Sequence, residues 1–243
     1  MCESHEHLGR KLSRRGVLSG AGALVAAGIV GFPRAFAEQP ISDTPAPNAI
    51  KPEAALQRLM DGNARYAANT PREKDYSAGR AARVSAQFPI AAVLGCSDSR
   101  VAPELAFDQG PGDMFVVRIA GNFVDDDGLA SLEYAVKFLG VPLIMVLGHQ
   151  NCGAVDAAVK VVTARAELPG HLPDLIKAIE PAVIAAHGRH PSDLVAASIE
   201  ENVRLNVKRL KADEPIVSEA MAAGKINVVG GIYDLASGKV ALL

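Results

Sequence analysis

The sequence predicts an α/β fold: a mostly parallel central β-sheet flanked by helices, with an antiparallel edge strand at the C-terminus. Short apolar runs, which suit strands buried on both faces, alternate with longer segments of helical periodicity. The chain has 243 residues, 49% of them hydrophobic, so it can bury the core of one large domain. The net charge of −2, the 5% aromatic content and the lack of Trp argue against nucleic acid as a partner.

Residues 1–37 have the organisation of an export signal. A cluster of Lys and Arg is followed by an uncharged run, 16–33, and by residues 35–37 (AFA), a small-x-small cleavage motif. Residues 13–18 (SRRGVL) resemble the twin-arginine export signal. The run is rich in Gly and Ala and shorter than the ~20 strongly apolar residues of a spanning helix, which favours a cleaved signal peptide over a stable membrane anchor. We therefore expect export machinery to carry the protein to the periplasm or another extracytoplasmic compartment.

A linker and one folded domain are predicted after this signal. Residues 38–51 are polar and Pro-rich, which is typical of an extended linker, and the domain is expected at 52–243. Periodicity predicts a first helix from Pro52 to Ala68, and the polar segment 70–87 is expected to be a loop with a short helix. Apolar runs predict strands at 89–95, 114–119, 143–148, 225–230 and 239–242, the last two as a hairpin around Ser237-Gly238. Helical patterns lie between them at 128–139, 152–167, 173–187 and 192–211, the last with Ser192 or Asp193 as N-cap.

Two of the predicted strands end in reactive side chains. The strand 89–95 is followed by Cys96, Asp98 and Arg100, and the strand 143–148 is followed by His149 and Cys152. In open α/β sheets, functional sites form beyond the carboxyl ends of the strands. One turn of chain can offer His149 and Cys152 to a single ion, while Cys96 would reach it from a neighbouring strand. The third cysteine of the chain lies within the predicted signal, so these two are the only thiols of the exported domain.

This set of side chains favours a zinc site. Two thiolates and an imidazole suit tetrahedral Zn²⁺, and three protein ligands leave a fourth position for water, as in catalytic sites. Asp98 can accept a hydrogen bond from that water while Arg100 keeps the carboxylate ionised, or Asp98 can fill the fourth position and close the site. In an exported protein a disulfide between Cys96 and Cys152 is the main competing interpretation. The Asp and Arg beside Cys96 favour the metal, because a structural disulfide does not require them.

The two motifs together resemble those of the β-class carbonic anhydrases. The resemblance rests on residues 96–100 (CSDSR) and 149–153 (HQNCG), and 115–122 (FVVRIAGN) and 130–136 (ASLEYAV) support it. It covers the chain from about Ala54 to the C-terminus. The resemblance implies a carbonate dehydratase, a lyase that converts CO2 reversibly to bicarbonate and a proton by means of zinc-bound hydroxide. It also implies a homodimer or tetramer.

The resemblance assigns roles to individual residues. The implied zinc ligands are Cys96, His149 and Cys152. Asp98 and Arg100 are implied to form a catalytic dyad, in which Asp98 ligates zinc only in a closed state. Gly153 lies where family members offer a backbone N–H to bicarbonate, and Gln109 lies in the segment where some members place a substrate-side Gln. Ile119 stands where Asn is common, and the lack of Trp removes one residue of a second bicarbonate site found in some members.

Three other functions are compatible with the same residues. A CO2 analogue such as carbonyl sulfide (COS) or carbon disulfide (CS2) is hydrolysed by relatives on this scaffold, and pocket shape decides the substrate. A non-catalytic protein that binds zinc or bicarbonate would hold the metal with Asp98 in the fourth position. A redox protein would use Cys96 and Cys152 as its reactive pair.

Overall fold

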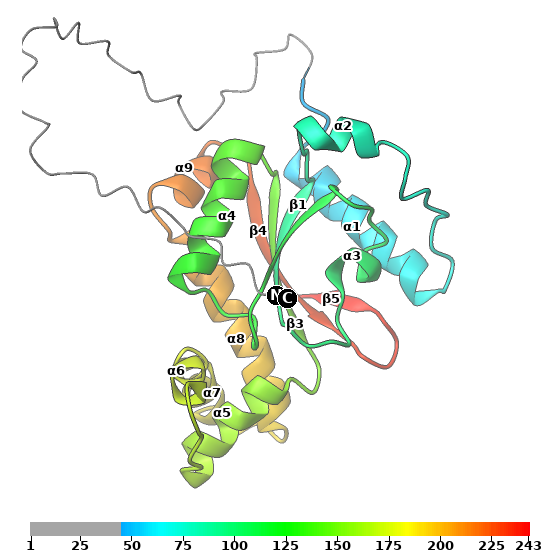
Figure 1. The fold of residues 1–243 in the computed structure, drawn as a ribbon. Coiled ribbons are helices and arrows are strands. Elements are labelled where there is room, and N and C mark those ends of the chain that lie inside the picture. The colour runs from blue at the N-terminus through cyan, green and yellow to red at the C-terminus, as the bar shows by residue number, and fades with distance from the viewer. Residues whose placement is uncertain (1–44) are drawn as a thin grey trace, which may run out of the picture. The chain divides into compact units, whose positions relative to one another are not determined.

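A five-stranded β-sheet lies at the centre of the structure, a computed structural model that describes residues 45–243 (Figure 1). The strand order is β2-β1-β3-β4-β5. The first four strands, which pair in parallel, are β1 (Ala91–Gly95), β2 (Met114–Arg118), β3 (Leu143–His149) and β4 (Asn227–Tyr233). The last strand, β5 (Val240–Leu242), pairs antiparallel with β4 at the sheet edge. The predicted fold class is therefore confirmed, whereas the predicted signal peptide, 1–37, lies outside the described residues.

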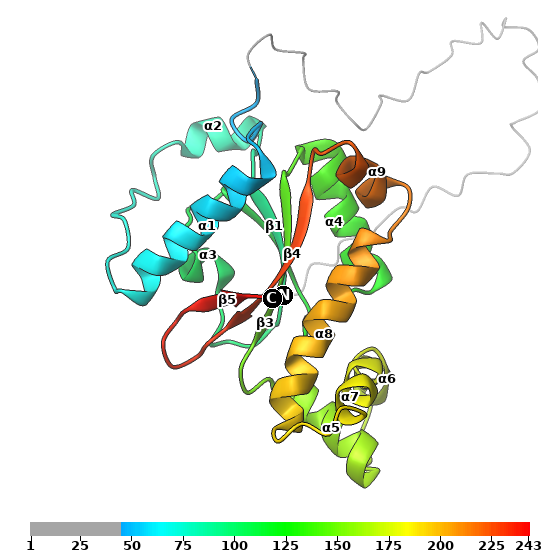
Figure 2. The same ribbon diagram turned by 180° about the vertical axis from the view of Figure 1, so that it is seen from behind.

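Helices cover both faces of the sheet, as Figures 1 and 2 show from opposite sides. The helices are α1 (Pro52–Ala67), α2 (Arg80–Ser85), α3 (Pro103–Ala106), α4 (Asp126–Leu139), α5 (Gly153–Ala164), α6 (Leu172–Lys177), α7 (Glu180–His187), α8 (Leu194–Lys211) and α9 (Ile216–Ala222). α1 and α3 cover one face, and α4, α8 and α9 cover the other. α5, α6 and α7 gather beyond the end of β3, next to the start of α8. This end of the sheet holds the reactive residues.

The central strands are buried on both faces, which explains their uninterrupted apolar sequence. In β3, Met145 packs into the core with α1, and its neighbours Ile144 and Val146 pack into the core with α4 and α8. Successive side chains of a strand point to opposite faces, so every residue of a central strand meets a helix. All seven residues of β3 are buried.

The segment predicted as one helix, 173–187, forms two helices. Pro181 lies in the first turn of α7. In a continuous helix this residue would have to donate a hydrogen bond to the carbonyl of Lys177, but proline has no N–H and its ring clashes with that carbonyl. α6 accordingly ends at Lys177, and the tighter bond from Ile179 N–H to Ile176 O, 2.8 Å, bridges the two helices.

Other boundaries differ because caps and close contacts decide them. α4 begins two residues before the predicted start, because the Asp125 side chain accepts from Gly128 N–H at 2.7 Å. Asp193, one of the two predicted caps, caps α8. β4 continues through Gly230, where the predicted strand ends; a Cβ there would lie 2.7 Å from a Val203 methyl of α8. The helices α3 and α9 were not predicted, since both are too short to show a period.

The chain packs against the domain before Pro52. Asn48, within the segment predicted as linker, is 2% exposed, and its side-chain amide donates to the carbonyls of Pro89, at 3.0 Å, and Leu139, at 2.7 Å. These bonds place the N-terminal boundary of the packed domain inside the predicted linker. Between residues 45 and 243, the structure contains no helix with the length and apolarity needed to cross a membrane.

Candidate metal centre

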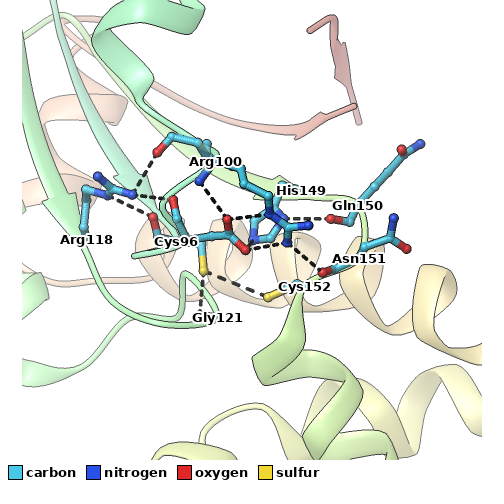
Figure 3. A network of polar contacts seen from close by, with 10 residues as sticks. Cys96, Arg100, Arg118, Gly121, His149, Gln150, Asn151 and Cys152 are labelled. Atoms are coloured by element: carbon cyan, nitrogen blue, oxygen red, sulfur yellow. Dashed lines mark hydrogen bonds and ion pairs between the residues drawn. The ribbon is translucent and has the colours of Figure 1, made fainter. Parts of the chain in front are cut away.

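The carboxyl ends of β1 and β3 bring the three predicted ligands together. The parallel register pairs Gly95 with Leu147, so Cys96, directly after β1, and His149, the last residue of β3, lie at the same edge of the sheet. Cys152 follows as the N-cap of α5. Figure 3 shows the two sulfurs and the imidazole gathered at one place. The parallel topology therefore brings the three side chains together, as the positions of the two motifs predict.

The ligand atoms have the spacing of a tetrahedral site. The Sγ atoms of Cys96 and Cys152 and a ring nitrogen of His149 all lie within 4.8 Å of one another, and the two sulfurs are 4.0 Å apart. Zn–S bonds of about 2.3 Å in tetrahedral geometry separate two sulfurs by roughly 3.8 Å. All three side chains are buried, and both cysteines are free thiols. The structure thus holds separate sulfurs at a metal-like spacing and no disulfide between them.

His149 presents one nitrogen to this position. Its Nδ1 lies 2.8 Å from the carbonyl of Gln150 and donates to it, because that oxygen can only accept. In the neutral ring, which is the form that binds a metal, Nε2 is then the unprotonated nitrogen. This atom is buried without a hydrogen-bond partner among the described residues. A buried acceptor without a partner is costly unless something binds it. The orphaned nitrogen, aimed at two thiols, fits a metal ligand whose other nitrogen is fixed by the backbone.

The contact between the two thiols shifts their pKa values in opposite directions. The Cys152 thiol is a hydrogen-bond partner of Cys96, and this contact lowers the pKa of Cys96 although burial opposes the shift. The same contact, together with burial, raises the pKa of Cys152. One thiolate therefore forms readily, and the second requires a further positive charge, which a divalent metal supplies.

Backbone N–H groups point at both sulfurs. Gly121 N–H donates to Sγ of Cys96 at 3.2 Å. The N–H groups of Ala154 and Val155, in the first turn of α5, hydrogen-bond to Cys152 and favour its thiolate. The N-terminus of a helix carries partial positive charge, so both donors and dipole stabilise negative sulfur.

Arg100 holds Asp98 at the edge of the ligand cluster. The guanidinium Nε donates to Oδ1 at 2.9 Å and the terminal nitrogen donates to Oδ2 at 2.7 Å. This bidentate pair lowers the pKa of Asp98 well below its ordinary value and keeps the carboxylate ionised. Oδ2 lies 3.8 Å from Nε2 of His149. The dyad predicted from the sequence is therefore formed, and Asp98 stands beside the metal position.

Arg118 fixes the loop that carries Cys96 and Asp98. Its guanidinium donates to the carbonyls of Cys96, at 2.9 Å, Asp98, at 2.7 Å, and Val101, at 2.8 Å. No role for Arg118 was predicted from the sequence. A cation at the end of an apolar strand, next to the strand that precedes Cys96, was the signal that could have identified it.

The two predicted substrate residues lie in different places. Gly153 is the first residue of α5, next to a ligand, and no atom lies within 4 Å of the position that a Cβ would take. Gln109 is buried, and its amide donates to Phe107 O at 2.7 Å. It lines a cavity of about 280 Å³ together with Arg58 and Lys74, and the lining of that cavity includes none of the three candidate ligands.

Comparisons with known proteins show which family this chain resembles. The family model described as carbonic anhydrase matches residues 91–240. Carbonic anhydrase 2 of Mycobacterium tuberculosis is 41% identical over 192 residues, which cover 79% of this chain and 92% of that protein. The β-carbonic anhydrase of Coccomyxa, solved in complex with acetazolamide, has 30% identity and a TM-score of 0.61 over 77% of this chain and 86% of its own.

A second solved structure is also similar. It is one of the crystal structures of two tetrameric β-carbonic anhydrases of Sordaria macrospora, with 25% identity and a TM-score of 0.63, and the match covers 78% of this chain and 97% of that protein's chain. The matched segment 91–240 begins at β1 and ends at the start of β5, so it includes every residue of the ligand cluster and the Asp98–Arg100 pair. From this match, the 41% identity and the shared fold, the chain belongs to the β-class carbonic anhydrases.

Proposed function

We propose that this protein converts CO2 reversibly to bicarbonate and a proton with Zn²⁺ bound by Cys96, His149 and Cys152. The observation that carries the proposal is the unpartnered Nε2 of His149, which lies within 4.8 Å of two thiol sulfurs. When bound there, Zn²⁺ supplies the Lewis acidity that makes water a nucleophile near neutral pH. The relatives named carbonic anhydrase support CO2 as the substrate.

Asp98 and Arg100 would orient the attacking water. Arg100 engages both carboxylate oxygens, which leaves Asp98 ionised and able to accept a hydrogen bond from the water. Because Asp98 is held by Arg100 and is not part of the close ligand cluster, this geometry supports the open state, with the fourth metal position free for water.

The surroundings of the cluster would bind the substrate and exclude bulk water. Phe123, Val155 and Ile199 belong to the same buried apolar cluster as the two cysteines, so the site has an apolar wall suited to CO2. Gly153 begins α5, where backbone N–H groups have no partners within the helix and can donate to bicarbonate. The negative charge of bicarbonate would thus be stabilised by the positive N-terminal end of α5.

Zinc content and stopped-flow CO2 hydration, measured on the same preparations, test this function. Wild type is expected to bind one zinc ion per chain and to hydrate CO2, whereas Cys96→Ser and His149→Ala are expected to lose both. His171→Ala, at an exposed histidine, is the matched control and should behave as wild type. Full zinc content in both ligand variants would contradict the ligand assignment. If the protein binds zinc but turns over only COS or CS2, or turns over no substrate, the proposed reaction is wrong.

We also propose that the active protein is a homo-oligomer. The Sordaria macrospora neighbours are described as tetrameric, and their likeness covers 78% of this chain. Light scattering after size exclusion should give the mass of a dimer or tetramer. A monomer with full CO2 hydration activity would overturn this proposal.

Export to the periplasm or a similar compartment is proposed from the N-terminal sequence. The support is the motif 13–18 (SRRGVL), followed by an uncharged run and residues 35–37 (AFA). Fractionation of cells that express the full chain should place the shortened protein outside the cytoplasm. Replacement of Arg14 and Arg15 by Lys should retain the full-length chain inside, and unchanged export would contradict a twin-arginine route.

A further inference from the structure

Helix α8 carries two buried amides on the face that it turns toward the sheet. Asn202 is 1% exposed and Asn206 is 7% exposed. They are four residues apart, so they lie one above the other on the same side of the helix. Polar groups in such a position are costly unless their hydrogen bonds are made inside the protein. Their partners therefore indicate what the two amides do.

The partners form a directional chain of hydrogen bonds that leads to one loop. Oδ1 of Asn206 accepts from Val124 N–H at 2.7 Å. Nδ2 of Asn206 donates to Oδ1 of Asn202 at 3.1 Å and to the backbone carbonyl of Asn202 at 2.7 Å. Nδ2 of Asn202 then donates to the carbonyl of Gly121 at 2.8 Å. Since Val124 offers a donor and Gly121 offers an acceptor, only one orientation of each amide satisfies all of these bonds. We refer to Asn202 and Asn206 as the asparagine pair.

The chain of hydrogen bonds ends at the carbonyl oxygen of Gly121, and the N–H of the same residue contacts the sulfur of a proposed metal ligand. Residues 119–122 form a β-turn closed by a backbone hydrogen bond of 2.8 Å between its end residues. Gly121 is the third residue of the turn and has φ +86°, as a type II turn requires. Its N–H donates to Sγ of Cys96 at 3.2 Å, as Figure 3 shows, while its C=O accepts from Asn202. The two bonds hold Gly121 from both sides of its Cα.

We propose that Asn202, oriented by Asn206, is a positioning residue for the metal ligand Cys96. It anchors the Gly121 peptide so that the N–H···S hydrogen bond keeps its direction and length. That bond withdraws electron density from the thiolate and orients its lone pairs, and partners of this kind govern metal affinity. The inference rests on the proposed zinc site and extends it to α8, 106 residues along the chain from Cys96.

A purely structural role makes a different prediction. If the asparagine pair only anchors α8 to the loop, its loss would lower stability and leave the metal unaffected. If it positions Cys96, its loss would change properties that belong to the sulfur–metal bond. Co²⁺ reports on this bond, because a thiolate–cobalt site absorbs light through charge transfer from sulfur.

The chain offers a matched control. Asn63 is 3% exposed, and its amide donates to the carbonyls of Ala106, at 2.9 Å, and Gly238, at 2.8 Å, while its Oδ1 accepts from Val240 N–H at 2.8 Å. It is therefore a buried, fully bonded asparagine whose partners lie on α3, the β4–β5 connection and β5 instead of on the Cys96 loop. Asn63→Leu and Asn202→Leu remove equivalent groups from different places.

The experiment compares wild type, Asn202→Leu and Asn63→Leu by zinc affinity, in competition with a chelator, and by the absorption of the Co²⁺-substituted full chain. Asn202→Leu is expected to lose about tenfold in zinc affinity, and its charge-transfer band should move to longer wavelength, because a thiolate without its N–H donor releases an electron more easily. Asn63→Leu should melt at a lower temperature with wild-type affinity and spectrum. Wild-type affinity and spectrum in Asn202→Leu would overturn the inference.

A milder variant covers the case in which Asn202→Leu fails to fold. Asn206→Asp retains the acceptor for Val124 N–H and removes the Nδ2 donor, which bonds to the side-chain oxygen of Asn202 and, at 2.7 Å, to its backbone carbonyl. It should show the same spectral shift at smaller amplitude, and an unchanged spectrum would contradict the inference. If wild type itself binds neither Zn²⁺ nor Co²⁺, both the proposed metal site and this inference are wrong. If the asparagine variants lose only stability, the inference is wrong and the proposed metal site stands.

Discussion

The guanidinium of Arg100 binds both carboxylate oxygens of Asp98, at 2.9 Å and 2.7 Å. It also donates to the carbonyl of Asn151 at 3.3 Å, in the turn that separates two of the ligands. Arg100 therefore connects the loop after β1 with the loop after β3. Its position explains how an exposed arginine can act on a buried centre.

Loss of this pair should impair catalysis more than stability. Arg100→Gln removes the bidentate contact, and we expect kcat/KM for CO2 to fall about 10–100-fold. Since Arg100 lowers the pKa of Asp98, the acid limb of the pH–rate profile should move to higher pH in the variant. Arg204→Gln, at an exposed arginine of α8, is the control. Wild-type kcat/KM in Arg100→Gln would show that the pair has no catalytic role.

Zinc affinity should increase with pH. In the metal-free protein the contact between the two thiols lowers the pKa of Cys96 and raises that of Cys152, so the pair retains a proton at neutral pH. Zinc binding must displace this proton, and we expect the affinity to rise about tenfold per pH unit around neutrality. Chelator competition at several pH values, with calorimetry in two buffers to count released protons, measures this. Affinity that does not change with pH would mean that both thiols are already ionised.

Asp108 should contribute stability that acid removes. Burial alone would raise its pKa, but ion pairs with Lys74 and Arg65 outweigh burial and lower the pKa to about 2. Because the folded pKa is below that of the unfolded chain, the stabilisation is present above about pH 4 and is lost as the pH falls toward about 2. Urea unfolding should show that Asp108→Asn costs about 1–2 kcal/mol at pH 7 and much less at about pH 2. Asp174→Asn, in an exposed ion pair, should change little, and a pH-independent cost for Asp108→Asn would refute the linkage.

Gly121→Ala should be more harmful than Gly140→Ala. Both glycines have a positive φ, +86° and +64°, so both substitutions carry the backbone cost of about 1 kcal/mol. A Cβ at Gly121 would in addition lie 2.5 Å from Cδ1 of Ile179, whereas nothing lies within 4 Å at Gly140. We expect Gly121→Ala to lose about 2–4 kcal/mol of unfolding free energy and to bind zinc more weakly. Equal stability and zinc affinity in the two variants would contradict the close packing of the turn.

The fold class and the convergence of the candidate ligands could be predicted from the sequence because their signals are local. A central strand such as β3 is buried on both faces, and its uninterrupted apolar run shows this without reference to any neighbour. The ligands follow directly after such strands, and parallel strands end at the same edge, so Cys96, His149 and Cys152 converge for a reason that can be stated in advance. The break between α6 and α7 was missed, since 173–187 was predicted as one helix, although its signal, Pro181, is equally local.

Tertiary structure alone decided the features that join distant segments. The close approach of Val203 of α8 to Gly230, in the middle of β4, is one such feature. The hydrogen bond between Asn202 and Gly121 joins residues 81 apart in sequence, and helical periodicity does not distinguish a buried asparagine from an exposed one. The cavity that Gln109 lines is likewise formed by residues distant in sequence, such as Arg58 and Lys74. Local pattern therefore determined the strands and the ligands, whereas the groups that orient those ligands were decided by long-range packing, because only folding brings a buried polar group to its partner.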